Sequence, residues 1–444
     1  MFTRVLLQNF KSFSNLNFDL TDWHNEPQKL IVIYGENGIG KSNLASAFYF
    51  LTESLQTMNT RDYLDAFLLE NKNLFDNKEQ IMDILSQGYK SLEKLIDEYK
   101  MIDSDEPMLL KYEFLINGKK GSYTIETNND RIIHERLEYL INQRRGTYFD
   151  LTPNSILINK EAFNDVIAYT EFKRSCEKYW GKYTLLSILM HESSDKTEQY
   201  IKRQINPKLL DILSFFSSTF SKVHSGNINE IENNIYSDYI MAHLYNGKIN
   251  IKYEPLLDKA ESIINTYFTS MLSEVNKAYY KRRYDETQIK YKLYLSKQIE
   301  GKTRDIEISD ESTGTQMLLE YLPYFLNAAE GKTSVIDEFD TGLHSHLLNS
   351  LIISIFNSIE GQMILTTHDI QIMNSPVPKK CFYIISNNAA GIREIKNILE
   401  YDNKIDSRYN VPAQYLSEKY GKLNNGNYIN FTKLLSAYKT ENNR

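Results

Sequence analysis

Residues 29–42 read KLIVIYGENGIGKS, and this stretch decides the fold class. Lys29–Tyr34 is a short apolar run, rich in β-branched residues, with the right length for a buried strand. A helix is predicted from about Ser42 to Gln56, because apolar residues recur there at helical spacing. A strand, a glycine-rich loop and a helix in this order are the context in which such a loop binds phosphate.

The loop itself, Gly35–Ser42, fits the pattern G-x-x-x-x-G-K-S. Glycines let the backbone curl so that N–H groups point at a phosphate chain, and the next helix presents its positive N-terminus. Lys41 adds a point charge toward the β- and γ-phosphates, and the Ser42 hydroxyl ligates Mg²⁺. The alternative is a glycine-rich turn with a solvated lysine. The residues predicted to bind the nucleotide here are Gly35, Asn37, Gly38, Gly40, Lys41 and Ser42.

A second apolar strand, Ser334–Ile336, ends in the two carboxylates Asp337 and Glu338. At the C-terminal edge of a parallel sheet they would point into the crevice where ligands bind. Asp337 is placed to hold Mg²⁺ together with Ser42, and Glu338 is placed to orient the attacking water. The alternative is an acidic strand end that faces solvent.

Two further segments complete the predicted site. Thr366–Asp369 ends the next strand, and His368 there is placed to reach the γ-phosphate, although a lone histidine is usually structural. Glu311–Gln316 combines a hydroxyl, a glycine and a helix start, so Ser312 and Gly314 form a second anion-binding helix N-terminus. The alternative for Ser312 is an ordinary helix cap. A second phosphate grip in a chain with one phosphate loop suggests a site that another subunit completes.

Strands and helices alternate at both ends of the chain, which predicts a largely parallel, covered sheet. We expect an N-terminal ATPase lobe over 1–160 with helical and β-hairpin elements, including a turn at Asn117-Gly118. A helical insertion is expected over 161–300, a C-terminal lobe over 301–400 and an extension over 401–444. The two lobes would build one sheet, with the middle of the chain inserted between them.

The composition fits a soluble protein, with 444 residues, 41% hydrophobic residues, 25% charged residues and a net charge of −7. It excludes wholesale disorder, a collagen-like fibre and a small disulfide scaffold. No window approaches the apolar length of a membrane span. Cys176 and Cys381 form no metal pattern and fit a reducing cytosol, so a cytoplasmic location is expected.

In chain order the four elements are the phosphate loop, the segment Glu311–Gln316, the carboxylate pair and His368. In this order they resemble the ABC-type ATPases of the branch that includes SMC- and RecF-like proteins, in which Glu311–Gln316 corresponds to the signature. Asn9–Phe13 also looks like that branch. The run Asp337–His344 is similar to AAA-type ATPases of prokaryotic anti-phage and abortive-infection systems, among them the RloA/AbiLi group, the ATPase of PARIS and the OLD nucleases. Tyr415–Gly421 resembles the close of RloA-like chains. The implied fold is an α/β P-loop NTPase of ABC type, with an antiparallel β subdomain and an inserted helical subdomain.

The resemblance further implies ATP hydrolysis with Mg²⁺ and head-to-tail pairing of two copies. Ser312 and Gly314 of one copy would face the γ-phosphate bound by Lys41 of the other, with Asp340 at that interface. The signature departs from the family pattern because it reads Ser-Thr-Gly-Thr-Gln at 312–316. Ser345 also stands where many relatives have proline.

OLD proteins carry a Toprim nuclease after the ATPase, which needs an Asp-x-Asp cluster. The residues after Glu400 are too few for that domain and contain Asp402 and Asp406 but no such cluster. We therefore expect a separate effector, such as a Toprim nuclease or an RNase, and a phage protein as a possible trigger. A DNA-repair ATPase that binds DNA directly and a nucleotide-gated scaffold that holds a toxin inactive are the alternatives.

Nucleic-acid contact stays open for the short basic runs Lys281–Arg283 and Arg144-Arg145. A solvated helix face is the alternative, but tyrosines surround the first run. His134, His191, His224 and His243 lack metal-ligand spacing and are expected to be structural.

Overall fold

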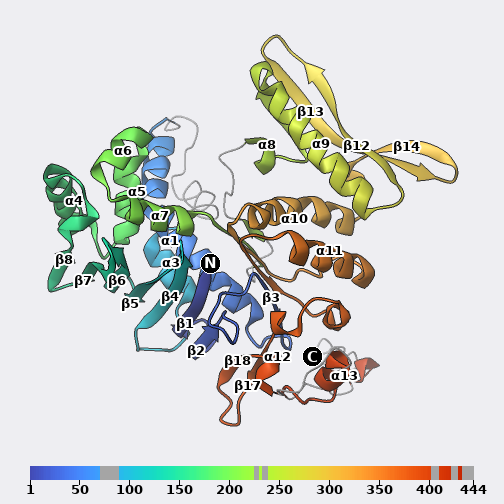
Figure 1. Ribbon diagram of the computed structural model, residues 1–444. Coiled ribbons are helices and arrows are strands. Elements are labelled where there is room, and N and C mark those ends of the chain that lie inside the picture. Colours follow the sequence, from blue (N-terminus) through green and yellow to red (C-terminus); the bar gives the residue numbers. More distant parts are fainter. Residues whose placement is uncertain (71–89, 225–229, 233–238, 402–409, 422–428, 433–444) are drawn as a thin grey trace, which may run out of the picture.

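The computed structural model describes residues 1–70, 90–224, 230–232, 239–401, 410–421 and 429–432 (Figure 1). Asp402 and Asp406 lie outside these residues. Three β-sheets organise the fold. The predicted α/β class is confirmed, with a largely parallel sheet that carries the phosphate loop and a separate antiparallel subdomain.

The central sheet has the strand order β10-β9-β15-β16-β3-β17-β18. The five inner strands run parallel, and the two edge strands are antiparallel to their neighbours. Every residue of β3, β15 and β16 is buried, as expected for strands covered on both faces. In chain order the strands are β3 (Leu30–Tyr34), β9 (Thr219–His224), β10 (Glu230–Glu232), β15 (Thr333–Ile336), β16 (Gln362–Thr366), β17 (Phe382–Asn387) and β18 (Arg393–Asn397).

Alternate residues of β3 face two different cores. Ile31 and Ile33 pack with α1 (Lys41–Glu70) and the antiparallel subdomain. Leu30 and Val32 pack with α10 (Thr313–Ala329) and α11 (Ser345–Ser358) on the opposite face. The strand therefore fixes α1 on one side of the sheet and the signature helix α10 on the other.

The antiparallel subdomain is a sheet of order β2-β1-β4-β5-β6-β7-β8. Its predicted Asn117-Gly118 turn is confirmed, because both residues have positive φ, as a two-residue hairpin turn requires. The strands are β1 (Phe2–Phe10), β2 (Phe13–Asp19), β4 (Met108–Ile116), β5 (Lys119–Thr127), β6 (Ile132–Ile141), β7 (Arg144–Thr152) and β8 (Ser155–Ile158). The helix α3 (Leu92–Tyr99) precedes β4.

The prediction of a helical insertion over 161–300 is wrong for much of that range. Its first part is helical, and α9 (Glu254–Met271) buries Leu257, Ala260, Ile264 and Phe268, but β9 joins the central sheet. The rest forms a third sheet, in which Lys281–Arg283 lie on a strand rather than a helix. Its strands are β11 (Asn246–Asn250), β12 (Val275–Tyr284), β13 (Gln288–Ile299) and β14 (Lys302–Glu307). The helices are α4 (Val166–Tyr179), α5 (Leu185–Ser194), α6 (Glu198–Gln204), α7 (Pro207–Ser217) and α8 (Tyr239–Ala242).

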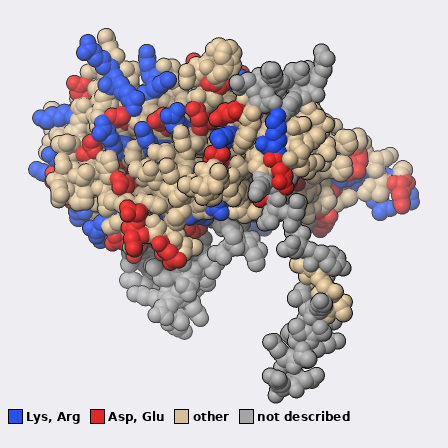
Figure 2. All heavy atoms as spheres, turned by 90° about the horizontal axis from the view of Figure 1, so that it is seen from below, with Lys and Arg blue, Asp and Glu red and all other residues tan. Residues whose placement is uncertain are grey.

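The physical reason for that error is visible in β13. Its buried residues Ile289, Tyr291, Leu293 and Leu295 alternate with exposed or half-buried ones, which is the period of a strand and not of a helix. Charged side chains of both signs also come from many parts of the chain. Seen from below, acidic and basic side chains are interspersed over one face (Figure 2). The C-terminal part adds α12 (Ile398–Tyr401) and α13 (Val411–Leu416).

None of the helices among the described residues is long and apolar enough to cross a membrane.

One buried side chain joins the antiparallel subdomain to the central sheet. The amide of Gln362, at the start of β16, accepts from the Phe2 backbone N–H at 2.8 Å and donates to the Phe2 and Gln28 carbonyls at 3.0 Å each. Gln362 is fully buried, so none of these groups has water as an alternative partner.

The substitution Gln362→Leu should therefore destabilise the protein, because it strands three buried backbone groups while preserving side-chain volume. We expect a loss of about 3 kcal/mol, measured as a lower urea midpoint. The matched control is Gln288→Leu at an exposed position, which should leave the midpoint nearly unchanged. Equal urea midpoints for both variants would contradict the proposed stabilising role of the Gln362 side-chain amide.

Candidate functional site

The carboxyl ends of three neighbouring parallel strands meet at the candidate site. β3 leads into the phosphate loop, β15 leads into Asp337 and Glu338, and β16 leads into Thr367 and His368. β16 lies between the other two, with Ile336 opposite Leu365 and Ile33 opposite Thr366. The parallel register thus brings together residues that lie about 300 positions apart in the chain.

The phosphate loop has the tight backbone that its glycines predict. Gly38 and Gly40 have φ of 76° and 116°, a region that side chains disfavour. A Cβ at Gly35 would lie 2.9 Å from the Ile385 carbonyl oxygen, and one at Gly40 would lie 2.8 Å from the Phe13 ring. Asn37 and Gly38 are exposed at the tip, and Ser42 is the second residue of α1. The loop is therefore a close-packed cradle at a helix N-terminus.

Lys41 lies inside this cradle. Its ammonium donates to the backbone carbonyls of Gly35 at 2.7 Å and Glu36 at 2.9 Å, and only 5% of the residue is exposed. Burial lowers the pKa of Lys41 to about 8, against the opposing pull of carboxylates that include Asp337 and Asp340. An incoming polyphosphate would supply anionic partners for a cation whose hydrogen-bond partners among the described residues are these two carbonyl oxygens.

The loop is held from outside by residues that sequence reasoning missed. Arg393 on β18 donates to the Ser12 carbonyl at 2.6 Å and to the Gly38 carbonyl at 3.2 Å. Asn43 donates to the Ser12 hydroxyl at 2.6 Å. The turn between β1 and β2 therefore supports the phosphate loop from below. No local motif marks Arg393, because its role depends on strand pairing at the far end of the chain.

Thr366 organises the two carboxylates. Its hydroxyl donates to Oδ1 of Asp337 and accepts from the Glu338 backbone N–H at 2.8 Å. Asp337 is fully buried, and its own N–H donates to the Lys222 carbonyl at 2.8 Å. Glu338 has φ of 50°, an uncommon conformation for a side-chain-bearing residue. Such strain persists where the surroundings enforce it, and here the Thr366 hydroxyl does so.

Asp340 and His368 lie together at the mouth of the site. Both carboxylate oxygens of Asp340 accept from the His368 backbone N–H, at 3.2 and 3.3 Å. Partial burial, followed by the charge of Lys41, lowers the pKa of the His368 imidazole. The side chain of His368 is exposed, so it is available to a group that approaches from solvent.

The predicted signature lies on a different loop. Ser312 caps α10 by accepting from the Thr315 N–H at 3.3 Å, which fits the ordinary cap reading as well as the phosphate reading. Gly314 packs so closely on the next loop that its Cβ would lie 2.3 Å from the Gly342 carbonyl oxygen. Among the bonds of the described residues, none joins Ser312 or Gly314 to the phosphate loop.

Two buried lysines tie this region together and were not singled out from sequence. Lys222 on β9 is 1% exposed and donates to Glu320 of α10 at 2.8 Å. Lys297 on β13 is 5% exposed and donates to Glu311, next to Ser312, at 2.7 Å. They connect the strand beside Asp337, the signature helix and the third sheet. The sequence signal that could have identified them is a lysine at an inward-facing position of a strand with alternating apolar residues.

The donor set fits a magnesium ion that is shared with a nucleotide. Asp337 and Ser42 offer a carboxylate and a hydroxyl, which are hard oxygen ligands, and Mg²⁺ typically takes few protein ligands plus substrate phosphates. Within the described residues, no cluster of three or more His, Cys, Asp or Glu side chains could hold a metal by itself. The residues thus fit a metal that arrives with its substrate.

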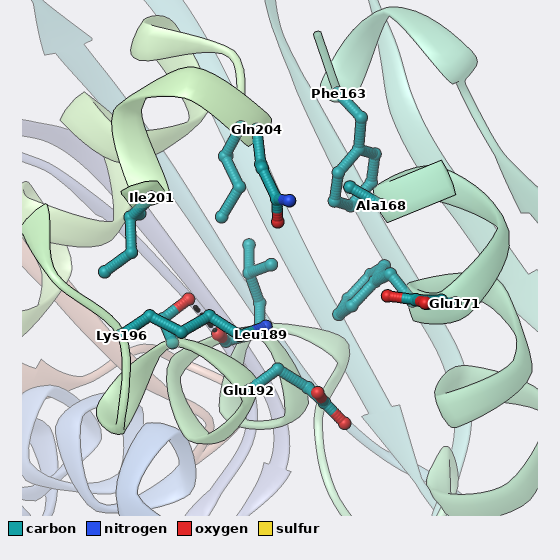
Figure 3. A pocket seen from close by; sticks show the side chains of 11 residues that line it. Phe163, Ala168, Glu171, Leu189, Glu192, Lys196, Ile201 and Gln204 are labelled. Carbon is teal, nitrogen blue, oxygen red and sulfur yellow. Dashed lines mark hydrogen bonds between the residues drawn. The ribbon is translucent and has the colours of Figure 1, made fainter. Parts of the chain in front are cut away.

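Two other hollows differ in what they can hold. A cavity of about 820 Å³ lies beside the phosphate loop, lined in part by Glu36, Ile39 and the segment Tyr415–Gly421, and its size suits a small molecule. The hollow between α4, α5 and α6, with Glu171, Glu192 and Lys196 around it, has only about 30 Å³ (Figure 3). It has room for a water molecule and no nucleotide.

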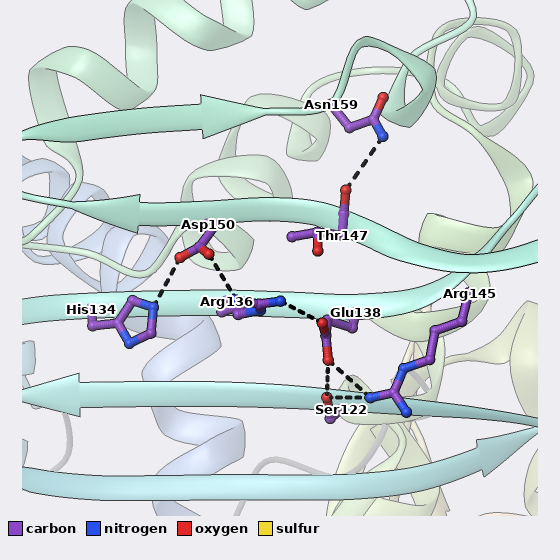
Figure 4. A network of polar contacts seen from close by, with 8 residues as sticks. All are labelled: Ser122, His134, Arg136, Glu138, Arg145, Thr147, Asp150 and Asn159. Atoms are coloured by element: carbon purple, nitrogen blue, oxygen red, sulfur yellow. Dashed lines mark hydrogen bonds and ion pairs between the residues drawn. The ribbon is translucent and has the colours of Figure 1, made fainter.

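Arg145, of the Arg144-Arg145 run, lies in an ion-pair network on β5, β6 and β7 (Figure 4). Arg145 pairs with Glu138 at 2.9 Å, and Arg136 pairs with Glu138 at 2.6 Å and Asp150 at 3.0 Å. His134 lies 2.9 Å from Asp150. Acidic neighbours thus balance these cations, as expected for a solvated face.

One family model matches part of the chain. Residues 192–374 match the family model described as "AAA domain, putative AbiEii toxin, Type IV TA system". The matched range contains Ser312, Asp337, Glu338 and His368 and excludes the phosphate loop. No curated protein matches. The matched range covers less than half of the chain.

Three solved structures of SMC heads are similar in part. One is an SMC head bound to the C-terminal winged-helix domain of ScpA, with 15% identity, coverage of 89% of this chain and 96% of that chain, and a TM-score of 0.40. The SMC head domain from Thermotoga maritima has 14% identity, with coverage of 89% of this chain and 98% of that chain and a TM-score of 0.35. The third is the Smc head domain with an extended coiled coil, bound to the C-terminal domain of ScpA derived from Pyrococcus furiosus. It has 15% identity, with coverage of 91% of this chain and 99% of that chain and a TM-score of 0.40. TM-scores this low carry no argument about function.

The substitution Thr366→Val tests the arrangement of the carboxylates. It keeps the shape of the side chain but removes the hydroxyl that binds Asp337 and the Glu338 N–H. We expect turnover of ATP to fall about 100-fold, with a much smaller change in nucleotide affinity, because misplaced reacting groups cost rate more than binding. Steady-state hydrolysis and titration with a fluorescent ATP analogue measure the two effects.

The control for this experiment is Ser334→Ala, which removes another buried hydroxyl on β15. That hydroxyl donates to the Tyr324 carbonyl at 2.9 Å. This variant should retain most of the activity. Wild-type turnover in Thr366→Val would show that its hydroxyl does not position the carboxylates.

Proposed function

We propose that the chain is a magnesium-dependent ATPase whose nucleotide sites are completed by a second copy. The observation that carries the proposal is the meeting of Lys41, Asp337 and Glu338 at one sheet edge, while the α10 start is packed through Gly314 against the loop of Gly342 instead. The first group suits a bound triphosphate. The second presents a helix N-terminus to solvent, because Ser312 and Thr313 are exposed.

The roles of the residues follow from their surroundings. Lys41 and the loop N–H groups would bind the β- and γ-phosphates, and Ser42 and Asp337 would hold Mg²⁺. When bound, the metal offsets phosphate charge. Glu338, held by the Thr366 hydroxyl, would orient the attacking water, and His368 would donate to the γ-phosphate. Asp340 fixes the backbone of His368 and thereby its direction.

Pairing of two copies explains why one chain has two anion-binding helix ends. In a head-to-tail pair, Ser312 and Gly314 of one copy would close on the γ-phosphate that Lys41 of the other binds. Hydrolysis removes the γ-phosphate and with it the charge that both copies share. The pair would therefore close with ATP and open after turnover.

A mixing experiment tests the composite site. Lys41→Ala and Ser312→Arg should each abolish hydrolysis, because each breaks both sites of a pair. In an equal mixture, mixed pairs contain one site with both defects and one intact site, so about a quarter of wild-type turnover should return.

The mixture of Lys41→Ala with Glu338→Gln is the control, because both changes fall on the same half of the site and no intact site can form. Restored turnover in this control, or none in the first mixture, would contradict completion by a second copy. Sedimentation of each variant with ATP checks that both remain folded.

We further propose that this ATPase senses infection and regulates a separate effector in anti-phage defence. The support is the family description, which names a toxin of a toxin–antitoxin system. The resemblance of Asp337–His344 to defence ATPases points the same way. The trigger would be a phage component, and the effector a nuclease encoded nearby.

Infection of cells that express the chain with its neighbouring genes tests this role. Wild type should reduce plaque number, Lys41→Ala should lose the protection, and Lys119→Gln at an exposed turn should keep it. Protection that persists in Lys41→Ala would separate defence from nucleotide binding. Copurification from the native host would identify the effector.

A further inference from the structure

The sheet β11-β13-β12 has one covered face and one open face. The helix α9 lies along one face of this sheet (Figure 1), where Tyr280, Leu293 and Leu295 share a buried apolar cluster with residues of α9. Arg282 points to the same side and binds three carboxylates of α9, those of Glu254, Asp258 and Glu261, at 2.6 to 3.2 Å. The residues that alternate with these face away from the helix.

Cations lie side by side on the open face. Lys248, Lys290 and Arg283 are cross-strand partners on β11, β13 and β12. In the next row, Lys292 is paired with Lys281. Like charges directly opposite each other destabilise a sheet. The fold therefore bears a cost here that packing does not explain.

Acidic partners balance only part of this charge. Lys292 binds Glu307 at 2.9 Å, and Lys281 lies 3.9 Å from Asp305. In the described part of the chain, no carboxylate is within ion-pair distance of Lys248, Arg283 or Lys290. Elsewhere the same protein neutralises its cations: Arg145 pairs with Glu138 (Figure 4), and Arg282 pairs with Glu261.

Tyrosines extend the same face. Tyr279 and Tyr294 are cross-strand partners with ring centroids 6.3 Å apart, and the Lys281 ammonium lies 3.8 Å from the Tyr294 ring centroid. The basic residues and Tyr294 line an open groove of about 670 Å³, together with His243 and Asn246. A groove that combines cations with aromatic rings suits a strand whose phosphates and bases alternate.

We propose that this groove binds single-stranded nucleic acid. Lys248, Arg283 and Lys290 contact backbone phosphates, and bases stack on the ring of Tyr294 in the groove and on that of its cross-strand partner Tyr279 beside it. An acidic protein would need the cations but not the tyrosines. A duplex keeps its bases stacked on each other and leaves the rings without a role.

The groove is connected to the nucleotide site but does not depend on it. Lys297, on the covered side of β13, binds Glu311 next to Ser312 at 2.7 Å. Strand binding is therefore expected to persist in Lys41→Ala. This separates the inference from the proposed function, which requires nucleotide binding.

Fluorescence anisotropy of the full chain with a labelled oligonucleotide of about 15 nucleotides tests the groove. We expect the slope of log K against log salt to be about −2, for three phosphate contacts. The double substitution Arg283→Gln/Lys290→Gln should weaken binding about tenfold and reduce the slope by about 1.4. Because it removes like-charge repulsion, its melting temperature should equal or exceed that of the wild type.

The matched control is Lys119→Gln/Lys120→Gln, at an exposed turn of the antiparallel subdomain, which should bind as the wild type does. Arms with single-stranded DNA and single-stranded RNA identify the preferred strand, and binding of either supports the proposal. It is overturned if neither binds, if the control loses as much affinity as the test variant, or if a duplex of equal length or polyglutamate binds at least as tightly.

Discussion

The site depends on the parallel register of β3, β16 and β15. Each strand ends where its neighbour ends, so the phosphate loop, His368 and the two carboxylates share one edge although they come from distant parts of the chain. The Thr366 hydroxyl then converts this shared edge into a fixed arrangement, since it binds Asp337 and holds the backbone of Glu338. A shift of one residue in β16 would remove that hydroxyl from both partners.

The sequence predicted this edge well because its elements are local. A glycine-rich loop, an apolar strand with terminal carboxylates and a capped helix each have a signature within a few residues. Arg393, Lys222 and Gln362 escaped prediction because their partners lie far away in sequence. The third sheet was missed for another reason, since its alternating tyrosines and lysines resemble a polar helix face when only the basic run is considered.

The regions around Arg145 and Lys290 show that sequence alone does not tell whether a basic side chain is neutralised by an acidic neighbour. Arg145 and Lys290 both lie on antiparallel strands and both look solvated in the sequence. Glu138 balances Arg145, whereas Lys290 lies between Lys248 and Arg283. Only strand register distinguishes a neutralised surface from one that keeps its positive potential.

The contact between Gly314 and Gly342 has a consequence for a paired assembly. Gly342 follows Asp340 in the loop after the two carboxylates, and in the proposed pair this loop would serve the chain's own nucleotide while Gly314 would serve that of the other copy. With no side chains between them, these two backbones have no slack, and any shift of one displaces the other. Binding at one active centre would thus shift the loop that serves its twin, so nucleotide affinity at the two sites would be coupled although each intact site still turns over.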